Sequence, residues 1–430
     1  MRQGILVGIL VLTTTGLQGI KDLMIAYAYG TTPAADAFQF AYNFLFNIQS
    51  VFSSAMTTAL IPVYVSARQH SGRESAWAMT LLVARRSTAA LALIAAVAWL
   101  IFQGVISTVA GFSADTRAQS LASFNFMLFG LVLSGVAAVF VSAANADGRN
   151  AFASLFPSFG AIPVLLTAAM VFRGGADPRA IYLALATLGA ALLQFLVLLG
   201  FLRASGYSAS LDASLIDPAS VKRVGKLFVV IVSGSLLLST TVQVNQYVAA
   251  NIGPGALATL VNGQKLVALV AAVASNFILV MLLPRFSHLV ASGQKSTVLR
   301  ELLRIVGWSA AAGIVFIVLV SLAPKAIVQL VFQRGQFDAN DSVNVAAVLQ
   351  LAIFQLPFFL VGQVINQYLL AHHQHKLLAF STLVMAVVCV PMAFVLASSW
   401  GLAGVVINGV LVYVITSACL VFFVSRQLRA

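Results

Sequence analysis

The chain has 430 residues, of which 61% are hydrophobic and only 8% charged, and its mean hydropathy is +1.00. A soluble domain carries about 25% charged residues. This sequence therefore has too few polar side chains to cover a water-exposed surface, which excludes a soluble enzyme, a transcription factor and a disordered scaffold. The formal net charge is +13, and two cysteines, Cys389 and Cys419, stand inside apolar runs with no disulfide or metal spacing.

Twelve apolar segments follow one another along the chain, each long enough to cross a bilayer. A hydrocarbon core about 30 Å thick needs roughly 20 residues of helix, and continuous apolar runs favour helices over the short alternating segments of a barrel. We therefore predict an all-α polytopic membrane protein with spans at about residues 4–29, 34–64, 80–110, 118–144, 150–172, 179–202, 224–250, 256–284, 302–323, 340–370, 377–398 and 401–425.

Three of these segments, the second, the eighth and the tenth, are long enough to be tilted or bent. Pro357 and Pro391 stand inside spans, where proline usually kinks a helix. The first segment starts after Arg2 and runs to Tyr29. This is longer than the roughly 7–15-residue apolar core of a signal peptide, so we expect it to be retained as a span.

The lysines and arginines divide unevenly between the two sides of the predicted membrane. With the N-terminus in the cytoplasm, 17 of the 24 lie on the cytoplasmic side and 5 outside, as expected when positive loops stay inside. The remaining two, Lys21 and Lys265, fall inside spans. The positive charge therefore serves mainly to orient the helices, with both termini cytoplasmic, and nucleic-acid binding is not expected.

A stretch rich in Ser, Gly, Asp and Pro, 204–221, is the best linker candidate. It separates an N-terminal six-helix bundle, 1–203, from a C-terminal six-helix bundle, 222–430. Both halves place a proline, Pro62 and Pro284, where we expect the second span to close before a basic loop. Six spans in each half give the halves the same orientation, which predicts two pseudo-symmetric bundles around a central cavity.

Polar residues enter several spans at the spacing of one helix face. In the second span, six of them recur at a mean interval of 3.6 residues, the helical period. These residues are Asp36, Gln39, Asn43, Asn47, Ser50 and Ser54. Similar groups are Thr14, Gln18 and Lys21 in the first span, Ser235, Ser239, Gln243 and Gln246 in the seventh, Thr259, Asn262 and Lys265 in the eighth, and Gln363, Asn366 and Gln367 in the tenth.

Each of these polar groups has two interpretations. Lysine in mid-helix costs ~2.5–3.5 kcal/mol on insertion scales and is retained where it faces a cavity or a partner. Lys21 either snorkels or pairs with Asp22 or Asp36, or it faces the cavity; Lys265 has no carboxylate in its own segment, which favours the cavity. The amides either bond one helix to another or line that cavity.

The predicted cavity is cationic and rich in amides. Among the eleven acids only Asp22 and Asp36 lie at membrane depth, which disfavours an organic cation and favours an anionic substrate such as a lipid diphosphate, because lysine binds phosphate as a point charge. The cluster from His372 to Lys376 is best interpreted as a solvated basic loop. The sequence contains no Walker motif and predicts no metal, no cofactor and no catalytic residue.

Several motifs resemble those of the MurJ/MviN-type lipid II flippases, a family within the multidrug/oligosaccharidyl-lipid/polysaccharide exporter superfamily. They are Tyr29-Gly30, Ala35-Asp36-Ala37-Phe38, Leu60-Ile61-Pro62 and, between the ninth and tenth spans, Val331-Phe332-Gln333-Arg334-Gly335-Gln336-Phe337-Asp338. Lys21-Asp22 stands where that family has Arg-Asp, and Lys265 where it has a cavity arginine. The resemblance implies a V-shaped cavity between two bundles and transport by alternating access.

Some family features are replaced in this chain. Thr15 stands where the family usually has an arginine, and the stretch 42–47 replaces its Pro-Asn-x-x-Arg-Arg run. The family often has fourteen spans, against the twelve predicted here. The cationic cavity is thus reduced to two lysines and amides, so the carried lipid is either lipid II or a related undecaprenyl-diphosphate-linked exopolysaccharide repeat unit.

These observations predict a flippase of the bacterial inner membrane that moves a polyprenyl-diphosphate-linked saccharide across the bilayer. In this hypothesis Lys21, beside Asp22, and Lys265 attract the diphosphate. The residues expected to bind sugar hydroxyls or line the path are Asp36, Asn43, Asn47, Gln49, Gln243, Gln246 and Asn262. Glycan-synthesis enzymes are the candidate protein partners. Two alternatives stay open, a cation-coupled multidrug exporter and a non-transporting scaffold of a glycan-synthesis complex.

Overall fold

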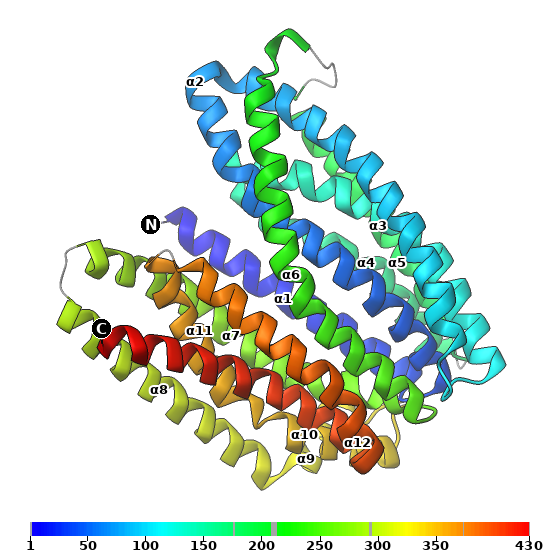
Figure 1. Ribbon diagram of the computed structural model, residues 1–430. Coiled ribbons are helices and arrows are strands. Elements are labelled where there is room, and N and C mark those ends of the chain that lie inside the picture. The colour runs from blue at the N-terminus through cyan, green and yellow to red at the C-terminus, as the bar shows by residue number, and fades with distance from the viewer. Residues whose placement is uncertain (1, 175–176, 208–212, 292–294, 373, 430) are drawn as a thin grey trace. The chain divides into compact units, whose positions relative to one another are not determined.

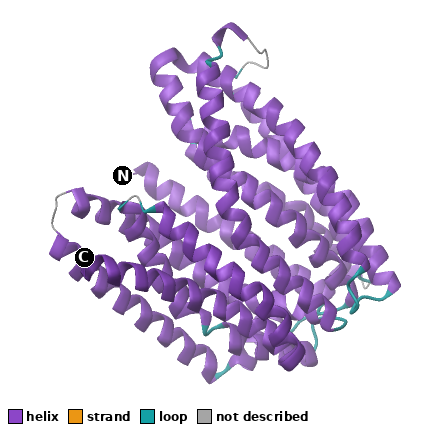
Figure 2. Cartoon of the chain, viewed as in Figure 1, coloured by secondary structure: helices purple, strands orange, loops and turns teal. Residues whose placement is uncertain are grey.

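The computed structural model describes residues 2–174, 177–207, 213–291, 295–372 and 374–429. Within these ranges every regular element is helical (Figures 1 and 2). The helices are α1 Arg2–Tyr29, α2 Pro33–Ser107, α3 Ala114–Ala146, α4 Asn150–Gly174, α5 Ala180–Ala204, the short 3₁₀ helix η1 Ala213–Leu215, α6 Pro218–Ile252, α7 Ala256–Ala291, α8 Lys295–Leu322, α9 Pro324–Phe332, α10 Ala339–Ala352, α11 Gln355–Ala371 and α12 His375–Arg429.

The longest helix, α2, is a hairpin of two spans that turns at Gly72. This residue has φ 88° and ψ 171°, a conformation open essentially only to glycine. On either side of the turn the chain runs back along itself, since the rings of Phe40 and Phe44 each lie within 6 Å of the ring of Phe102, at 5.7 and 5.5 Å between centroids. Figure 1 shows the sharp turn. The second and third predicted spans are therefore the two arms of α2.

A second hairpin forms in α12, where Gly401 adopts φ 55° and ψ −133°. The rings of Phe380 and Phe423 lie 5.7 Å apart, so the two arms again pack side by side. Gly404 makes the turn possible, because a Cβ there would lie 2.0 Å from the carbonyl oxygen of Leu396. The eleventh and twelfth predicted spans are the arms of this hairpin.

The tenth predicted span is broken, as its length suggested. The axes of α10 and α11 meet at 42°, and Pro357 stands in the first turn of α11. Its ring cannot donate a backbone hydrogen bond to the carbonyl group of Ile353, four residues earlier, which is where α10 ends. Proline therefore accounts for the bend.

The number of apolar helices agrees with the predicted number of membrane spans. In the described part of the chain nine helices are long and apolar enough to cross a membrane, and the bent pair of α10 and α11 adds a tenth span. Because α2 and α12 each contain two predicted spans, these helices account for all twelve. The all-α polytopic fold class is confirmed.

The prediction that Pro62 closes its span was wrong. Pro62 lies inside α2, which continues for nine more residues before it breaks at Gly72. A proline removes one backbone hydrogen bond but leaves the bonds of the flanking turns intact, whereas Gly72 leaves the helical conformation altogether. The backbone of α7 likewise continues past Pro284 to Ala291.

The chain divides into two compact units, Met1–Leu236 and Leu237–Ala430, called unit 1 and unit 2 below. The division falls within α6, so this helix belongs to both. In unit 1, α3 packs against α2 and α5, and α4 packs against α1 and α5. In unit 2, α11 packs against α7, α8 and α12, and α10 against α7 and α9. The boundaries 203 and 222, with a linker between them, stay a prediction.

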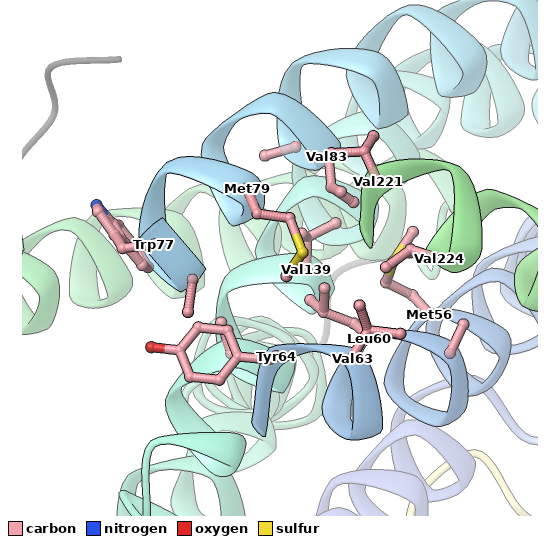
Figure 3. Close-up of a cluster of buried hydrophobic side chains, with 14 of the residues drawn as sticks. Met56, Leu60, Val63, Tyr64, Trp77, Met79, Val83, Val139, Val221 and Val224 are labelled. Carbon is pink, nitrogen blue, oxygen red and sulfur yellow. The ribbon is translucent and has the colours of Figure 1, made fainter. Parts of the chain in front are cut away.

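A cluster of buried apolar side chains in unit 1 lies beside the turn of α2. Side chains from both arms of α2, including Leu60 and Met79, pack against Val139 of α3 and against Val221 and Val224 at the start of α6 (Figure 3). Close van der Waals packing between such side chains holds helices together within a bilayer, where lipid is as apolar as the side chains themselves. This core holds the first turns of α6 against the α2 hairpin.

Candidate functional site

The polar stripe of α2 becomes more exposed along the helix. Asp36 and Gln39 are buried, Asn43 and Asn47 are partly exposed, and Ser54 is exposed. The carboxylate of Asp36 lies in the first turn of α2, where the positive end of the helix dipole favours an anion. The stripe thus begins in the core of unit 1 and ends at its surface.

Within that stripe several polar groups bond their own helix. The Asn47 amide donates to the carbonyl oxygen of Asn43 at 2.9 Å, and the Ser50 hydroxyl donates to that of Asn47 at 3.1 Å. Local bonds of this kind do not link one helix to another. Gln39 Oε1 is buried and has no hydrogen-bond partner among the described residues. Gln49 is partly exposed on the same arm.

Lys21 of α1 pairs with its sequence neighbour. Its Nζ lies 3.4 Å from Oδ1 of Asp22, with side-chain exposures of 12% and 38%. The same nitrogen lies 6.0 Å from the ring centroid of Tyr42 on α2. Of the two acids considered as ion-pair partners of Lys21, Asp22 is the one within ion-pair distance among the described contacts. The ion pair is long and its acid half-exposed, so it holds the lysine only weakly, and a role in diphosphate binding stays a prediction.

The other polar residues of α1 bond α4. The Thr14 hydroxyl lies 2.9 Å from the carbonyl oxygen of Ser154 and 2.7 Å from the Ser158 hydroxyl. Gln18 donates from Nε2 to the carbonyl oxygen of Pro157 at 2.9 Å. The helix-bonding interpretation therefore applies to this group.

In unit 2 the predicted residues of α7 contact each other. Lys265 donates from Nζ to Oδ1 of Asn262 at 3.1 Å, one turn earlier in the helix. Asn262 is buried, and its Nδ2 has no hydrogen-bond partner among the described residues. Gly263 lets α7 approach α10 closely here, because a Cβ on it would lie 2.4 Å from Val348. The close approach fixes this turn of α7.

The residues predicted on α6 lie in the same unit. Gln243 and Gln246 are both partly exposed, and the Oε1 atom of Gln246 is buried with no hydrogen-bond partner in the described part of the chain. Since Lys21 and the α2 stripe belong to unit 1 while these residues belong to unit 2, a cavity shared by all of them stays a prediction.

An amide pair in unit 2 was not predicted. Asn408 of α12 donates from Nδ2 to Oδ1 of Asn245 on α6 at 2.8 Å, and both residues are buried. The next residue, Gly409, lies beside the amide groups of Asn245 and Gln264, which would be in ordinary van der Waals contact with a Cβ there, at 3.9 and 3.6 Å. The only sequence signal was a lone asparagine in the last apolar span, and its partner lies 163 residues away.

The motif at 331–338 forms a rigid turn between α9 and α10. Gly335 has φ 65°, and the rings of Phe332 and Phe337 stack 5.4 Å apart and are buried. Asp338 then caps α10 in a reciprocal capping box with Asp341. The glycine, the aromatic pair and the capping acid all have structural roles in the connection between α9 and α10.

Metal ligands do not gather in the part of the chain that the structure describes: no three His, Cys, Asp or Glu side chains there lie close enough to hold an ion. The histidine cluster falls partly outside that part, since His373 is not described and His375 is described only in its backbone.

Comparison with protein families gives a match over nearly the whole chain. The family model described as "Lipid II flippase MurJ" matches residues 25–430. A probable lipid II flippase MurJ from Rhizobium meliloti (strain 1021) is 23% identical over 352 residues, covering 80% of this chain and 65% of the relative. Another from Bdellovibrio bacteriovorus is 27% identical over 241 residues, covering 55% of this chain and 45% of the relative. The chain thus spans less than two thirds of either relative.

Solved structures share the fold at low sequence identity. A lipid II flippase MurJ in an inward closed conformation has a TM-score of 0.77 at 16% identity, covering 98% of this chain and 87% of that chain. An inward-facing multidrug resistance transporter of the MATE family, in the MOP superfamily, has a TM-score of 0.76 at 12% identity, covering 98% and 97%. These likenesses establish the two-bundle transporter fold.

Proposed function

The chain belongs to the MurJ family of lipid II flippases, and on that premise we propose that it moves an undecaprenyl-diphosphate-linked saccharide across the bacterial inner membrane by alternating access. It acts as a transporter and not as an enzyme. The match of the family model to residues 25–430 is the observation that carries the proposal. Both termini lie in the cytoplasm, as the distribution of lysine and arginine predicts.

The buried polar chemistry supports an anionic, hydroxyl-rich cargo. In this proposal Lys21 and Lys265 attract the diphosphate, with Asp22 beside Lys21. An ammonium group donates up to three hydrogen bonds, so Lys265 can hold the Asn262 oxygen at 3.1 Å and still bind a phosphate oxygen. The attraction between an ammonium group and a phosphate is stronger at membrane depth, because the local dielectric constant there is low.

The orphan amide atoms support the same assignment. Gln39 Oε1, Gln246 Oε1 and Asn262 Nδ2 have no hydrogen-bond partner among the described residues. A buried polar atom left unsatisfied destabilises a protein by about 1–3 kcal/mol, so such atoms persist where another partner completes them. Sugar hydroxyls both donate and accept, and can therefore satisfy an amide oxygen and an amide nitrogen alike. We assign the path to these atoms together with Asp36, Asn43, Asn47, Gln49 and Gln243.

The test is a flipping assay with purified protein in liposomes. Fluorescent lipid II is placed in one leaflet, and its movement is followed with a quencher that does not cross the membrane. We expect protein-dependent flipping of lipid II or, in a parallel assay, of an undecaprenyl-diphosphate-linked exopolysaccharide repeat unit. Rates equal to those of protein-free liposomes for both lipids would contradict the proposal.

A second candidate, a cation-coupled drug exporter, is favoured by one observation, the buried carboxylate of Asp36. An exporter of organic cations needs such an acid. Dye efflux that is abolished in Asp36→Asn and unchanged in Lys265→Ala would support this function. Glycan-synthesis enzymes remain candidate partners. If the chain is only a scaffold for such enzymes, replacing both lysines with alanine would leave glycan export intact.

A further inference from the structure

A network of charged and polar side chains closes the end of unit 1 where α2 turns, and the proposed transport path does not use it. Asp147, the residue that caps the C-terminus of α3, has a side chain only 5% exposed. Arg68 and Arg73 each place a terminal guanidinium nitrogen 3.0 Å from its carboxylate, Arg73 Nε donates to Oδ2 at 3.1 Å, and the Tyr207 hydroxyl donates to Oδ2 at 2.7 Å. We call this group of four side chains the Asp147 clasp.

The clasp bridges the turn of α2. Arg68 lies on the first arm and Arg73 on the second, on opposite sides of Gly72. Arg73 reaches one carboxylate oxygen with two nitrogens, while Arg68 approaches the other oxygen at 3.0 Å but off the hydrogen-bonding angle. One carboxylate therefore holds both arms of the hairpin to the end of α3.

The same clasp fastens the segment that leads into α6. Tyr207 follows α5, and its ring centroid lies 4.3 Å from that of Trp77 and 4.6 Å from the Arg73 guanidinium carbon. A short distance further on, the Ser75 hydroxyl donates to the carbonyl oxygen of Leu215 at 2.7 Å. Val221 of α6 is then buried in the core beside the turn, where Figure 3 shows it near Val83. Tyr207, Leu215 and Val221, all described residues, are thus each held beside the second arm of α2.

The charges and hydrogen bonds of the clasp favour one fixed arrangement of its side chains. A buried carboxylate is tolerated when it is paired and hydrogen-bonded, and the two guanidinium groups remain about half-exposed to solvent. Burial, followed by the hydrogen bond to Asp147, raises the pKa of Tyr207. Its hydroxyl therefore stays protonated, and stays a donor, throughout the physiological pH range.

We propose that Asp147 is a positioning residue for the transport cycle, which fixes the first turns of α6 to the α2 hairpin. The reason lies in the chain path. The boundary between the two units falls inside α6, after Leu236, so α6 is the covalent link through which a movement of unit 1 reaches unit 2. Its residues Val221, Val224 and Phe228 pack against the core beside the turn of α2, with the rings of Phe228 and Phe52 5.2 Å apart, so this core and the clasp beside it together attach α6 to unit 1. This inference rests on the proposed flippase function.

Two variants test the proposal, with one matched control. Asp147→Asn keeps the shape of the side chain and removes its charge. Tyr207→Phe removes only the hydroxyl, and this milder variant tests the proposal if Asp147→Asn does not fold. The control is Asp115→Asn at the other end of α3, whose carboxylate bonds only Gln119 of the same helix in the contacts described, at 2.7 Å. Amide hydrogen exchange over residues 213–228 reports release of the segment, and flipping of fluorescent lipid II at several lipid concentrations reports transport.

We expect faster exchange over 213–228 in Asp147→Asn by about tenfold or more, because losing a hydrogen bond to a charged group changes an equilibrium by at least that factor. The maximal flipping rate should fall by a similar factor with an unchanged KM, and less so in Tyr207→Phe. Asp115→Asn should match the wild type.

The inference is overturned if amide exchange over 213–228 is unchanged in both variants. It is also overturned if that exchange becomes faster while the flipping rate stays at the wild-type value. A raised KM at an unchanged maximal rate overturns it too, because that places Asp147 in substrate binding. If the wild type itself does not flip lipid, the proposed function fails, whereas the exchange measurement still decides whether the clasp holds the segment.

Discussion

The side chains of Asp147 and Asn262 are both largely buried, yet their polar atoms have different sets of partners. Three side chains from two other segments converge on the Asp147 carboxylate. Asn262 accepts a hydrogen bond from Lys265, while its own Nδ2 finds no hydrogen-bond partner among the described residues. Ion pairs and hydrogen bonds from two other segments stabilise one arrangement of the Asp147 carboxylate, although among the described contacts its Oδ1 atom has only the ion pair with Arg68. An amide nitrogen with no partner lowers stability unless a ligand or water completes it. The contrast distinguishes a carboxylate that several segments hold in place from an amide nitrogen that is available to a substrate.

Removing both lysines tests the substrate side of this contrast most strongly. For Lys21→Ala combined with Lys265→Ala we expect the flipping rate to fall at least about 100-fold, because hydrogen bonds to charged groups contribute about 1.5–3 kcal/mol each. The thermal unfolding midpoint in detergent should change little. The exposed pair Lys222→Ala and Arg223→Ala serves as the control for lost positive charge, and an undiminished rate in the lysine variant would remove both residues from the binding site.

Replacing one member of the Asn245–Asn408 pair tests whether a buried amide pair stabilises the fold. Asn408→Leu leaves Oδ1 of Asn245 buried without its donor at 2.8 Å, and we expect this to lower stability by about 1–3 kcal/mol. Thermal unfolding measures the effect. Ser398→Ala, whose hydroxyl bonds only Val395 of its own helix in the contacts described, is the control near the turn of the same hairpin. An unchanged midpoint for Asn408→Leu would show that this pair does not stabilise unit 2.

Replacing an amide whose buried oxygen has no hydrogen-bond partner among the described residues should raise stability, whereas Asn408→Leu should lower it. For Gln246→Leu we expect a slightly raised unfolding midpoint, because the buried Oε1 atom loses its desolvation penalty. Substrate affinity should fall by a few-fold, the equivalent of one neutral hydrogen bond of about 0.5–1.5 kcal/mol. The measurements are thermal unfolding and the KM for flipping, with Val242→Leu, an exposed neighbour one turn earlier, as control. A lowered midpoint would place Gln246 with the structural groups.

The smallest effect is expected for a solvent-exposed pair. Arg285 and Glu301 form an ion pair at 3.0 Å with side-chain exposures of 56% and 22%. Water and salt screen such a pair, so Glu301→Gln should change stability by less than about 1 kcal/mol and leave flipping unchanged. A larger loss, seen as a shifted unfolding midpoint at physiological salt, would mean that charge at the surface of unit 2 is as important as the clasp in unit 1.

Hydropathy predicted the spans well because the bilayer imposes a length of apolar helix on each of them. The broken tenth span was also foreseeable from Pro357. Pro62 misled the prediction because one lost backbone bond does not end a helix whose flanking turns remain packed, and the true turn at Gly72 depends on a positive φ that no hydrophobic pattern reports. The polar stripe of α2 was predictable from its period of 3.6 residues, but the bonding of Thr14 and Gln18 to α4 was not.

The sequence by itself determined what each segment is: its length, its apolar or polar face and its charge follow from local composition, and the family motifs between residues 29 and 338 follow from residue order. Only the tertiary structure decided which polar groups are satisfied. Asp147 meets Arg68 and Tyr207, 79 and 60 residues away in the chain, and Asn245 meets Asn408. The physical reason is that a hydrogen bond forms only within about 3 Å, and such distances between remote segments exist only once the helices have packed.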